Sequence, residues 1–181
     1  MALIAGKPTI GAAQKLSDNT RQEERHMPDQ THLSAEIRDM LMDCDLFDTL
    51  QPGDFHTAAG YFSLATLVEG ETIFNEGDAG TFMCILHHGV VSVRKTDAHG
   101  AQVEIATLRS GRAFGEMAVL DGERRSASCL AASDCLLLTL GKDSLEKMLN
   151  EAPRIAARII RALAVALSKR LRMQDGQRLA L

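Results

Sequence analysis

The segment that decides the fold reads Phe-Gly-Glu-Met-Ala-Val-Leu-Asp-Gly-Glu-Arg-Arg-Ser-Ala and occupies residues 114–127. Gly115 permits a tight backbone turn, and residues 116–120 can form one helical turn whose free N–H groups favour an anion. Downstream, Arg125 supplies a planar guanidinium suited to a phosphate, and Glu116 supplies an acceptor suited to a sugar hydroxyl. Together these groups predict a site for a phosphorylated sugar. The structural alternative is a surface loop that contains a Glu–Arg ion pair.

Short apolar or alternating runs, bounded by Gly and Asp, surround this segment between residues 64 and 140. The clearest of them are residues 72–74, 82–86, 90–93, 103–108 and 135–138. Many short strands with glycine-containing connections are typical of an antiparallel barrel or sandwich. Residues 97–100, Asp-Ala-His-Gly, predict a hairpin connection in which Gly100 takes a positive φ.

Helical patterns flank the strands on both sides. Ser34 can cap a first helix, because apolar residues follow it at helical spacing, and a break at Pro52-Gly53-Asp54 precedes a short helix over 55–61. Pro153 suits the first turn of a long helix that runs to about Met173.

The predicted fold is therefore α+β and mainly β, an antiparallel β-roll or jelly-roll barrel flanked by N-terminal helices and a long C-terminal helix. We expect one domain, 34–181, after a flexible arm. The predicted divisions are an arm over 1–33, helices over 34–63, the roll over 64–140 with its segment 114–127, helices over 141–173 and a tail over 174–181.

Residues 114–127 closely resemble the phosphate-binding cassette of the cyclic nucleotide-binding domain family, F-G-E-[LM]-A-L followed by a variable loop and R-[SAT]-A. Residues 70–78, Gly-Glu-Thr-Ile-Phe-Asn-Glu-Gly-Asp, are similar to the family's G-x-x-I-F-x-x-G-D signature. Residues 85–93 are similar to its I-L-x-x-G-x-v-x-v strand pair. The resemblance covers about residues 46–172. The members that this chain resembles include catabolite activator protein-like regulators and protein kinase A regulatory subunits.

This resemblance implies a β-roll that binds cAMP or cGMP. Glu116 would accept the ribose 2′-hydroxyl, Arg125 would pair with the cyclic phosphate, and Gly115 would let the backbone approach closely. The other residues expected along the sugar-phosphate are Met117, Ala118, Ser126 and Ala127.

The preferred base is a separate question. A hydroxyl after the phosphate arginine, here Ser126, can assist guanine recognition in eukaryotic relatives, but bacterial cAMP sensors also tolerate Ser there, and we favour cAMP over cGMP. Near the end of the long helix, Arg170 and Gln174 are candidates for contacts with the base.

The long helix carries an unusual distribution of charge. The net charge of the 181 residues is −4, yet residues 153–181 contain seven basic residues and one acidic residue. Two apolar rows on 153–173 indicate two partners, the roll and another helix, so we expect a homodimer through this helix; a well-buried terminal helix is the alternative. The opposite row is basic apart from Val165 and is expected to form the outer face; it consists of Arg154, Arg158, Arg161, Val165, Lys169 and Arg172.

Several classes of function are not expected from this sequence. No apolar run approaches the roughly 18 residues of a membrane span, so we expect no membrane insertion. The cysteines at 44, 84, 129 and 135 lack the spacing of a metal site, and neither an activated nucleophile nor an acid–base pair is evident, so we expect no metal and no enzyme activity. A helix-turn-helix needs far more chain than follows the long helix, so we expect no DNA binding.

The leading hypothesis is a stand-alone cytoplasmic sensor of cAMP or cGMP that signals through its C-terminal helix to an unknown protein effector. One alternative is a degenerate cyclic nucleotide-binding fold that binds no ligand and acts as an interaction scaffold. Another is a nucleic-acid or membrane-surface protein that uses the basic face of the long helix.

Overall fold

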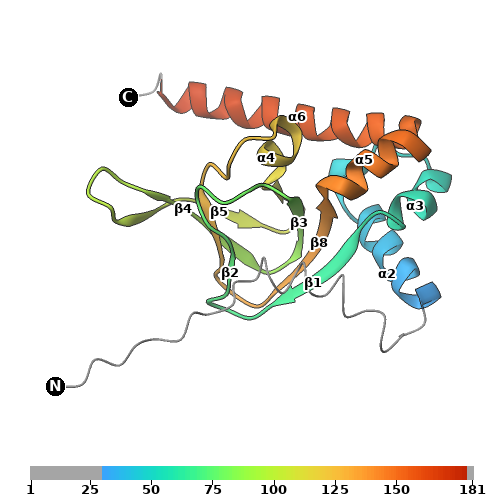
Figure 1. The fold of residues 1–181 in the computed structure, drawn as a ribbon, viewed down its shortest axis with the longest axis horizontal. Helices are drawn as coiled ribbons and strands as arrows, with labels where there is room; N and C mark the ends of the chain where they lie inside the picture. The colour runs from blue at the N-terminus through green and yellow to red at the C-terminus, as the bar shows by residue number, and fades with distance from the viewer. Residues whose placement is uncertain (1–29, 179–181) are drawn as a thin grey trace.

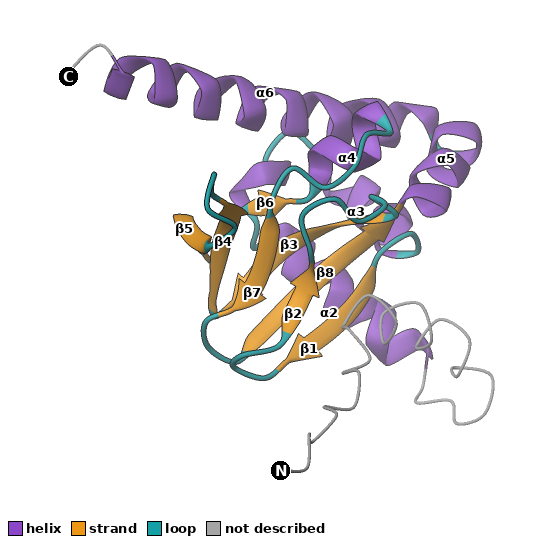
Figure 2. Cartoon of the chain, turned by 60° about the vertical axis from the view of Figure 1, so that its left-hand side comes forward, coloured by secondary structure: helices purple, strands orange, loops and turns teal. Residues whose placement is uncertain are grey.

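Two antiparallel four-stranded sheets form the body of the protein, as expected from the sequence. The computed structural model describes residues 30–178. One sheet has the strand order β1-β8-β3-β6 and the other the order β2-β7-β4-β5, and together they make the roll seen in Figure 2. The strands are β1 (Ser63–Leu67), β2 (Thr72–Phe74), β3 (Phe82–His88), β4 (Val90–Thr96), β5 (Gln102–Arg109), β6 (Ala113–Phe114), β7 (Ser128–Ala131) and β8 (Cys135–Gly141).

Helices flank the roll at both ends of the described chain. Figure 1 shows α6 running along one side of the molecule, over α4 and beyond the roll. The helices are α2 (Gln30–Met42), the 3-10 helix η1 (Asp45–Phe47), α3 (Pro52–Ala59), α4 (Glu116–Asp121), α5 (Lys142–Glu151) and α6 (Pro153–Arg178). Within residues 30–178, none of these helices combines the length and the apolar character that a membrane span requires.

The predicted strand runs are all confirmed, and three strands are added to them. β1, β6 and β7 were not among the predicted runs. The hairpin between β4 and β5 closes as expected, because Asp97 N–H donates to Ala101 O over 2.9 Å and Gly100 has φ +83°.

Helix boundaries differ from the sequence-based expectation at four places, one of them the end of the helix expected over 55–61, which stops at Ala59. α2 begins at Gln30 rather than Ser34, since no Gly or Pro lies between them to stop the helix. Residues 52–54 start α3 instead of breaking the chain, because Pro52 suits a first turn and Asp54 completes a capping box. α6 continues to Arg178 through most of the predicted tail; the rest of that tail, 179–181, and residues 1–29 of the predicted arm lie outside the described residues.

The buried apolar residues form two clusters. One lies inside the roll and includes Ile73, Phe74 and Leu86. The other joins the roll to the helices, since it combines residues of α2, η1, α3 and α5 with the first part of α6, up to Leu163. Segment 114–127 therefore lies between a packed roll and a long helix whose beginning belongs to the core.

Candidate functional site

The segment 114–127 leaves the roll at β6 and turns sharply at Gly115 into the short helix α4. Gly115 has φ +70° and ψ 6°, a left-handed conformation that favours glycine. A Cβ added here would lie 2.6 Å from Nη1 of Arg125 and 3.1 Å from the ring of Phe74. The glycine therefore lets the backbone approach the arginine closely.

Arg125 points into the molecule rather than toward solvent, with 3% of its surface exposed. Its Nη1 donates to Gly115 O over 2.7 Å and its Nη2 donates to Phe82 O. The guanidinium carbon lies 4.0 Å from the ring centroid of Phe74 and 4.9 Å from that of Phe82. Two aromatic rings and two carbonyls thus hold the guanidinium in a fixed position.

The backbone around Arg125 is fastened to the loop between β2 and β3. Arg125 N–H donates to Asp78 O, and Gly77 N–H donates to Arg125 O, both over 2.9 Å. The neighbouring Arg124 is exposed and donates from Nη1 to Gly77 O over 2.7 Å. The two sequence motifs, residues 70–78 and 114–127, therefore meet in one structural unit.

Glu116 is buried at the start of α4 and contacts α6. Its Oε1 accepts a hydrogen bond from Arg170 Nη1 over 3.1 Å, and Arg170 Nη2 donates to Ala113 O over 3.0 Å. Within residues 30–178, Oε2 of Glu116 has no hydrogen-bond partner. This oxygen is not completely buried. Arg170 thus holds one carboxylate oxygen and leaves the other available.

The remaining predicted site residues divide into exposed and buried groups. Ala118 is buried against Gly80, where an added Cβ would lie 2.1 Å from the Ala118 Cβ, so α4 rests directly on the glycine backbone. Met117 and Ser126 are exposed and Ala127 is half-buried. Gln174 belongs to α6, but its side chain lies outside the described part of the structure.

The electrostatics of Arg125 point to an anion. Burial lowers the pKa of Arg125, since a charged guanidinium loses solvation there. In the described part of the chain Arg125 makes no ion pair, and its buried Nε has no hydrogen-bond partner. The carboxylates of Asp78 and Glu116 act on Arg125 from a distance without forming an ion pair with it, so an anion placed directly beside the buried guanidinium would be favourable.

Three residues that shape the site, two beside Arg125 and one beneath α4, were not identified as site residues from the sequence. Phe74 and Phe82 supply the two rings that lie against the guanidinium, and Gly80 makes room for α4. Phe74 lies inside residues 70–78, so the motif already quoted there could have identified this ring as part of the site. Phe82 and Gly80 follow the motif and gave no separate signal.

In the part of the chain that the structure describes, the cysteines and acidic residues do not gather into a metal site. Cys44, Cys84, Cys129 and Cys135 are buried and free. Nowhere in residues 30–178 do three or more His, Cys, Asp or Glu side chains gather as metal ligands.

Comparison with known proteins agrees with this geometry. Residues 64–152 match the family described as "Cyclic nucleotide-binding domain". The chain is 34% identical over 130 residues to "Cyclic AMP receptor protein" of Thermus thermophilus, an alignment covering 72% of this chain and 58% of that protein. The chain spans 17% to 58% of the length of the first curated relatives.

Solved structures share the fold. A cyclic nucleotide-binding domain from Methylobacillus flagellatus is 25% identical, with a TM-score of 0.71 over 81% of this chain and 82% of that one. The N-terminal domain of a transcriptional regulator from Streptomyces coelicolor is 30% identical, with a TM-score of 0.63 over 72% of this chain and 93% of that one. The roll, the cassette with its buried arginine and these likenesses together show that the chain belongs to the cyclic nucleotide-binding domain family.

Proposed function

We propose that this protein is a cyclic nucleotide sensor that binds cAMP in preference to cGMP. The observation that carries the proposal is Arg125, a buried guanidinium without an ion-pair partner in the described structure and with an unpartnered Nε. A cyclic nucleotide carries a single negative charge, which matches one arginine. The preference for cAMP is supported by the relative named cyclic AMP receptor protein, whereas a relative named cGMP-dependent protein kinase leaves cGMP as the competitor to test.

The predicted site residues have the following roles in this proposal. Arg125 pairs with the cyclic phosphate, and the free Oε2 of Glu116 accepts the ribose 2′-hydroxyl. Gly115 permits close approach of the backbone. The residues proposed to line the sugar-phosphate are Met117, Ala118, Ser126 and Ala127, and Gln174 remains a proposed contact to the base.

For Arg170 we propose a positioning role in addition to the base contact expected from the sequence. It already holds Glu116 Oε1 and Ala113 O, so we assign it the task of positioning the ribose acceptor. This contact connects the site to α6, since Glu116 begins α4 and Arg170 lies on the long helix. A nucleotide that binds more tightly when Arg170 holds Glu116 would shift α6 toward the arrangement in which it is docked on α4. The equilibrium of α6 then changes by the same factor by which docking of α6 increases the affinity for the nucleotide.

The signal would leave the domain through the distal part of α6. Val165, Leu171 and Met173 are exposed there, which supports pairing with a second copy of the helix or with a protein effector. We propose a non-catalytic role, no binding of DNA and a cytoplasmic location.

The second candidate is a degenerate domain that serves as a scaffold without a ligand. The presence of both Glu116 and Arg125, each buried in the cassette, favours ligand binding over this alternative.

Calorimetric titration with cAMP, cGMP and 5′-AMP tests the proposal. We expect saturable binding of both cyclic nucleotides, tighter for cAMP, and much weaker binding of 5′-AMP, whose dianionic phosphate and open geometry fit the single arginine poorly. Equal or tighter binding of cGMP would overturn the base preference. Absence of binding to both cyclic nucleotides would favour the scaffold.

A further inference from the structure

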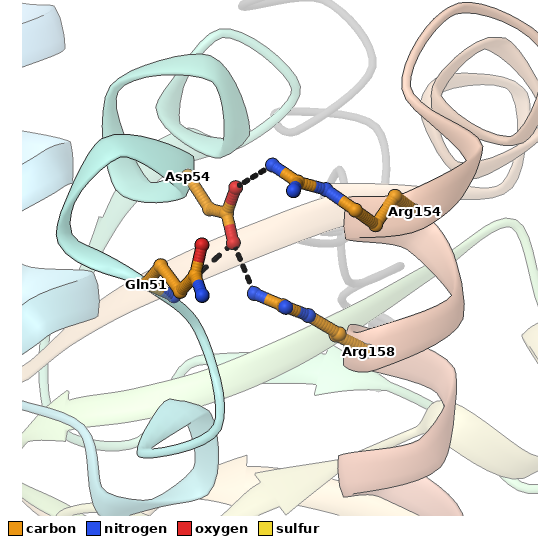
Figure 3. Close-up of polar contacts among 4 residues, drawn as sticks. All are labelled: Gln51, Asp54, Arg154 and Arg158. Carbon is orange, nitrogen blue, oxygen red and sulfur yellow. Dashed lines mark hydrogen bonds and ion pairs between the residues drawn. The ribbon is translucent and has the colours of Figure 1, made fainter.

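Asp54 connects two helices that lie far apart in the sequence. Its side chain is 4% exposed. Figure 3 shows its carboxylate facing two arginines of α6. Oδ1 accepts from Arg154 Nη2 over 2.9 Å, while Oδ2 accepts from Arg158 Nη1 over 2.5 Å and from Gln51 N–H over 3.1 Å. One buried carboxylate therefore caps α3 and at the same time fixes the first two turns of α6.

The two parts of α6 are held very differently. In the near part, residues 153–163, five apolar side chains are buried in the cluster that also contains residues of η1 and α3: Ile155, Ala156, Ile159, Ala162 and Leu163. In the far part, none of residues 164–173 is buried. The polar contact described for the far part is that of Arg170 with Glu116 and Ala113.

We propose that Asp54 is a positioning residue that holds the near part of α6 against α3. The near part then serves as a pivot, and only the far part changes its docking on the cassette. This inference rests on the proposed function for its link to the nucleotide, but the division of α6 itself does not need a ligand. The near part would move together with α2, η1 and α3, and the far part would depend on Arg170.

The pivot also changes the interpretation of the basic row. Arg154 and Arg158 were expected on an outer face of the helix. Arg154 is exposed as expected but also contacts Asp54, whereas Arg158 is half-buried against Asp54. The charges at Arg161, Lys169 and Arg172 remain exposed. The basic row thus serves two purposes, the first part for attachment within the molecule and the rest for the exposed surface.

Amide hydrogen exchange in the nucleotide-free protein tests the division directly. We expect Asp54→Asn to accelerate exchange over residues 154–163 by at least tenfold, because charge-assisted contacts of a buried carboxylate are lost. Arg170→Ala should accelerate exchange over 164–178 and leave 154–163 unchanged. Arg161→Ala removes an exposed charge from the same helix and is the matched control, with no change expected in either part.

A cycle of variants separates a specific contact from general destabilisation. If Asp54 acts through the two arginines, adding Arg154→Ala and Arg158→Ala to Asp54→Asn should cause little further acceleration over 154–163. Should Asp54→Asn fail to fold, Arg154→Ala, at a side chain that is 69% exposed, gives a milder version of the same test. Equal acceleration of both parts by Arg170→Ala, or no effect of Asp54→Asn, would overturn the pivot.

The nucleotide arm of the experiment is read separately. With cAMP bound, we expect slower exchange over 164–178 in the wild type and in Asp54→Asn, and no change over 154–163 in either. If the wild type binds no cyclic nucleotide, the proposed function fails while the nucleotide-free comparison still decides the pivot. If cAMP binds and protects both parts alike, the pivot fails while the proposed function stands.

Discussion

Arg170→Ala should weaken cAMP binding modestly and remove the response of α6. The substitution deletes the 3.1 Å contact to Glu116 and the 3.0 Å contact to Ala113 O. The Arg170 side chain is 37% exposed, so solvent screens the ion pair, and we assign the pair about 1 kcal/mol, the upper end for exposed pairs. That energy corresponds to about fivefold in an equilibrium constant.

Reciprocity sets the expected size of both effects. If docking of α6 strengthens nucleotide binding through Arg170, losing that contact weakens cAMP binding by at most about the same fivefold factor. Exchange over residues 164–178 should then be faster without nucleotide and should no longer slow when cAMP is added. Calorimetry measures the first effect, and hydrogen exchange with mass spectrometry measures the second.

Two outcomes would refute this reasoning. An unchanged affinity, together with an undiminished slowing of exchange over 164–178, would mean that Arg170 does not couple the site to the helix. A loss above about 30-fold, the 2 kcal/mol lower bound for breaking a buried charge pair, would place Arg170 on the nucleotide itself. Lys169→Ala, an exposed neighbour on α6, is the matched control.

Three further predictions concern the backbone, acid stability and thiols. Gly115→Ala should lower the melting temperature by about 2–8 °C, from about 1–2 kcal/mol of left-handed strain, and should weaken cAMP binding. Gly111→Ala is the control, because Gly111 has a similar left-handed φ of +83° but open space around an added Cβ. It should lower the stability of the protein without changing its affinity for cAMP. Equal losses of cAMP affinity in Gly115→Ala and Gly111→Ala would refute the proposed clash with Arg125. Burial would raise the pKa of Asp54, but the Gln51 N–H and the two arginines outweigh it and lower that pKa. The stability Asp54 supplies is therefore complete above about pH 4, its unfolded pKa, and is lost as pH falls through the folded pKa. Thermal melts should show the gap between wild type and Asp54→Asn narrowing from pH 6 to pH 3, and a constant gap would contradict this. Burial raises the pKa of Cys129 to about 12 and that of Cys84 even further, so a thiol reagent at pH 8 should label these residues only after unfolding; rapid labelling of the native protein would count against their burial.

The parts of the fold that the sequence predicted are those with a local pattern. β3, β4, β5 and β8 consist of apolar or alternating runs bounded by turn residues, and all were expected. β6 has two residues, Ala113 and Phe114, and is defined by pairing with Ile85 and Cys84 across the sheet. A strand that short has no periodicity of its own, so long-range pairing is needed to find it.

The site shows the same division between local and distant information. Gly115, Glu116 and Arg125 lie within one short segment, so their proximity could be predicted from the sequence, while their roles toward a ligand stay a prediction. The ring of Phe82 beside Arg125 and the contact of Arg170 with Glu116 join residues more than forty positions apart. Asp54 and Arg158, 104 positions apart, meet because apolar packing brings α3 against α6, which no local motif announces.

The most direct test of the central claim is calorimetric titration of cAMP into wild type, Arg125→Ala and Arg124→Ala. The two arginines are adjacent, but Arg125 is buried in the cassette and Arg124 is exposed. Losing one partner of a buried charge pair costs about 2–5 kcal/mol, so Arg125→Ala should weaken cAMP binding at least about 30-fold. Arg124→Ala should stay within a few-fold of the wild type, and thermal melts of both variants verify that they fold. Near-equal affinities of wild type and folded Arg125→Ala would contradict the assignment of the phosphate site.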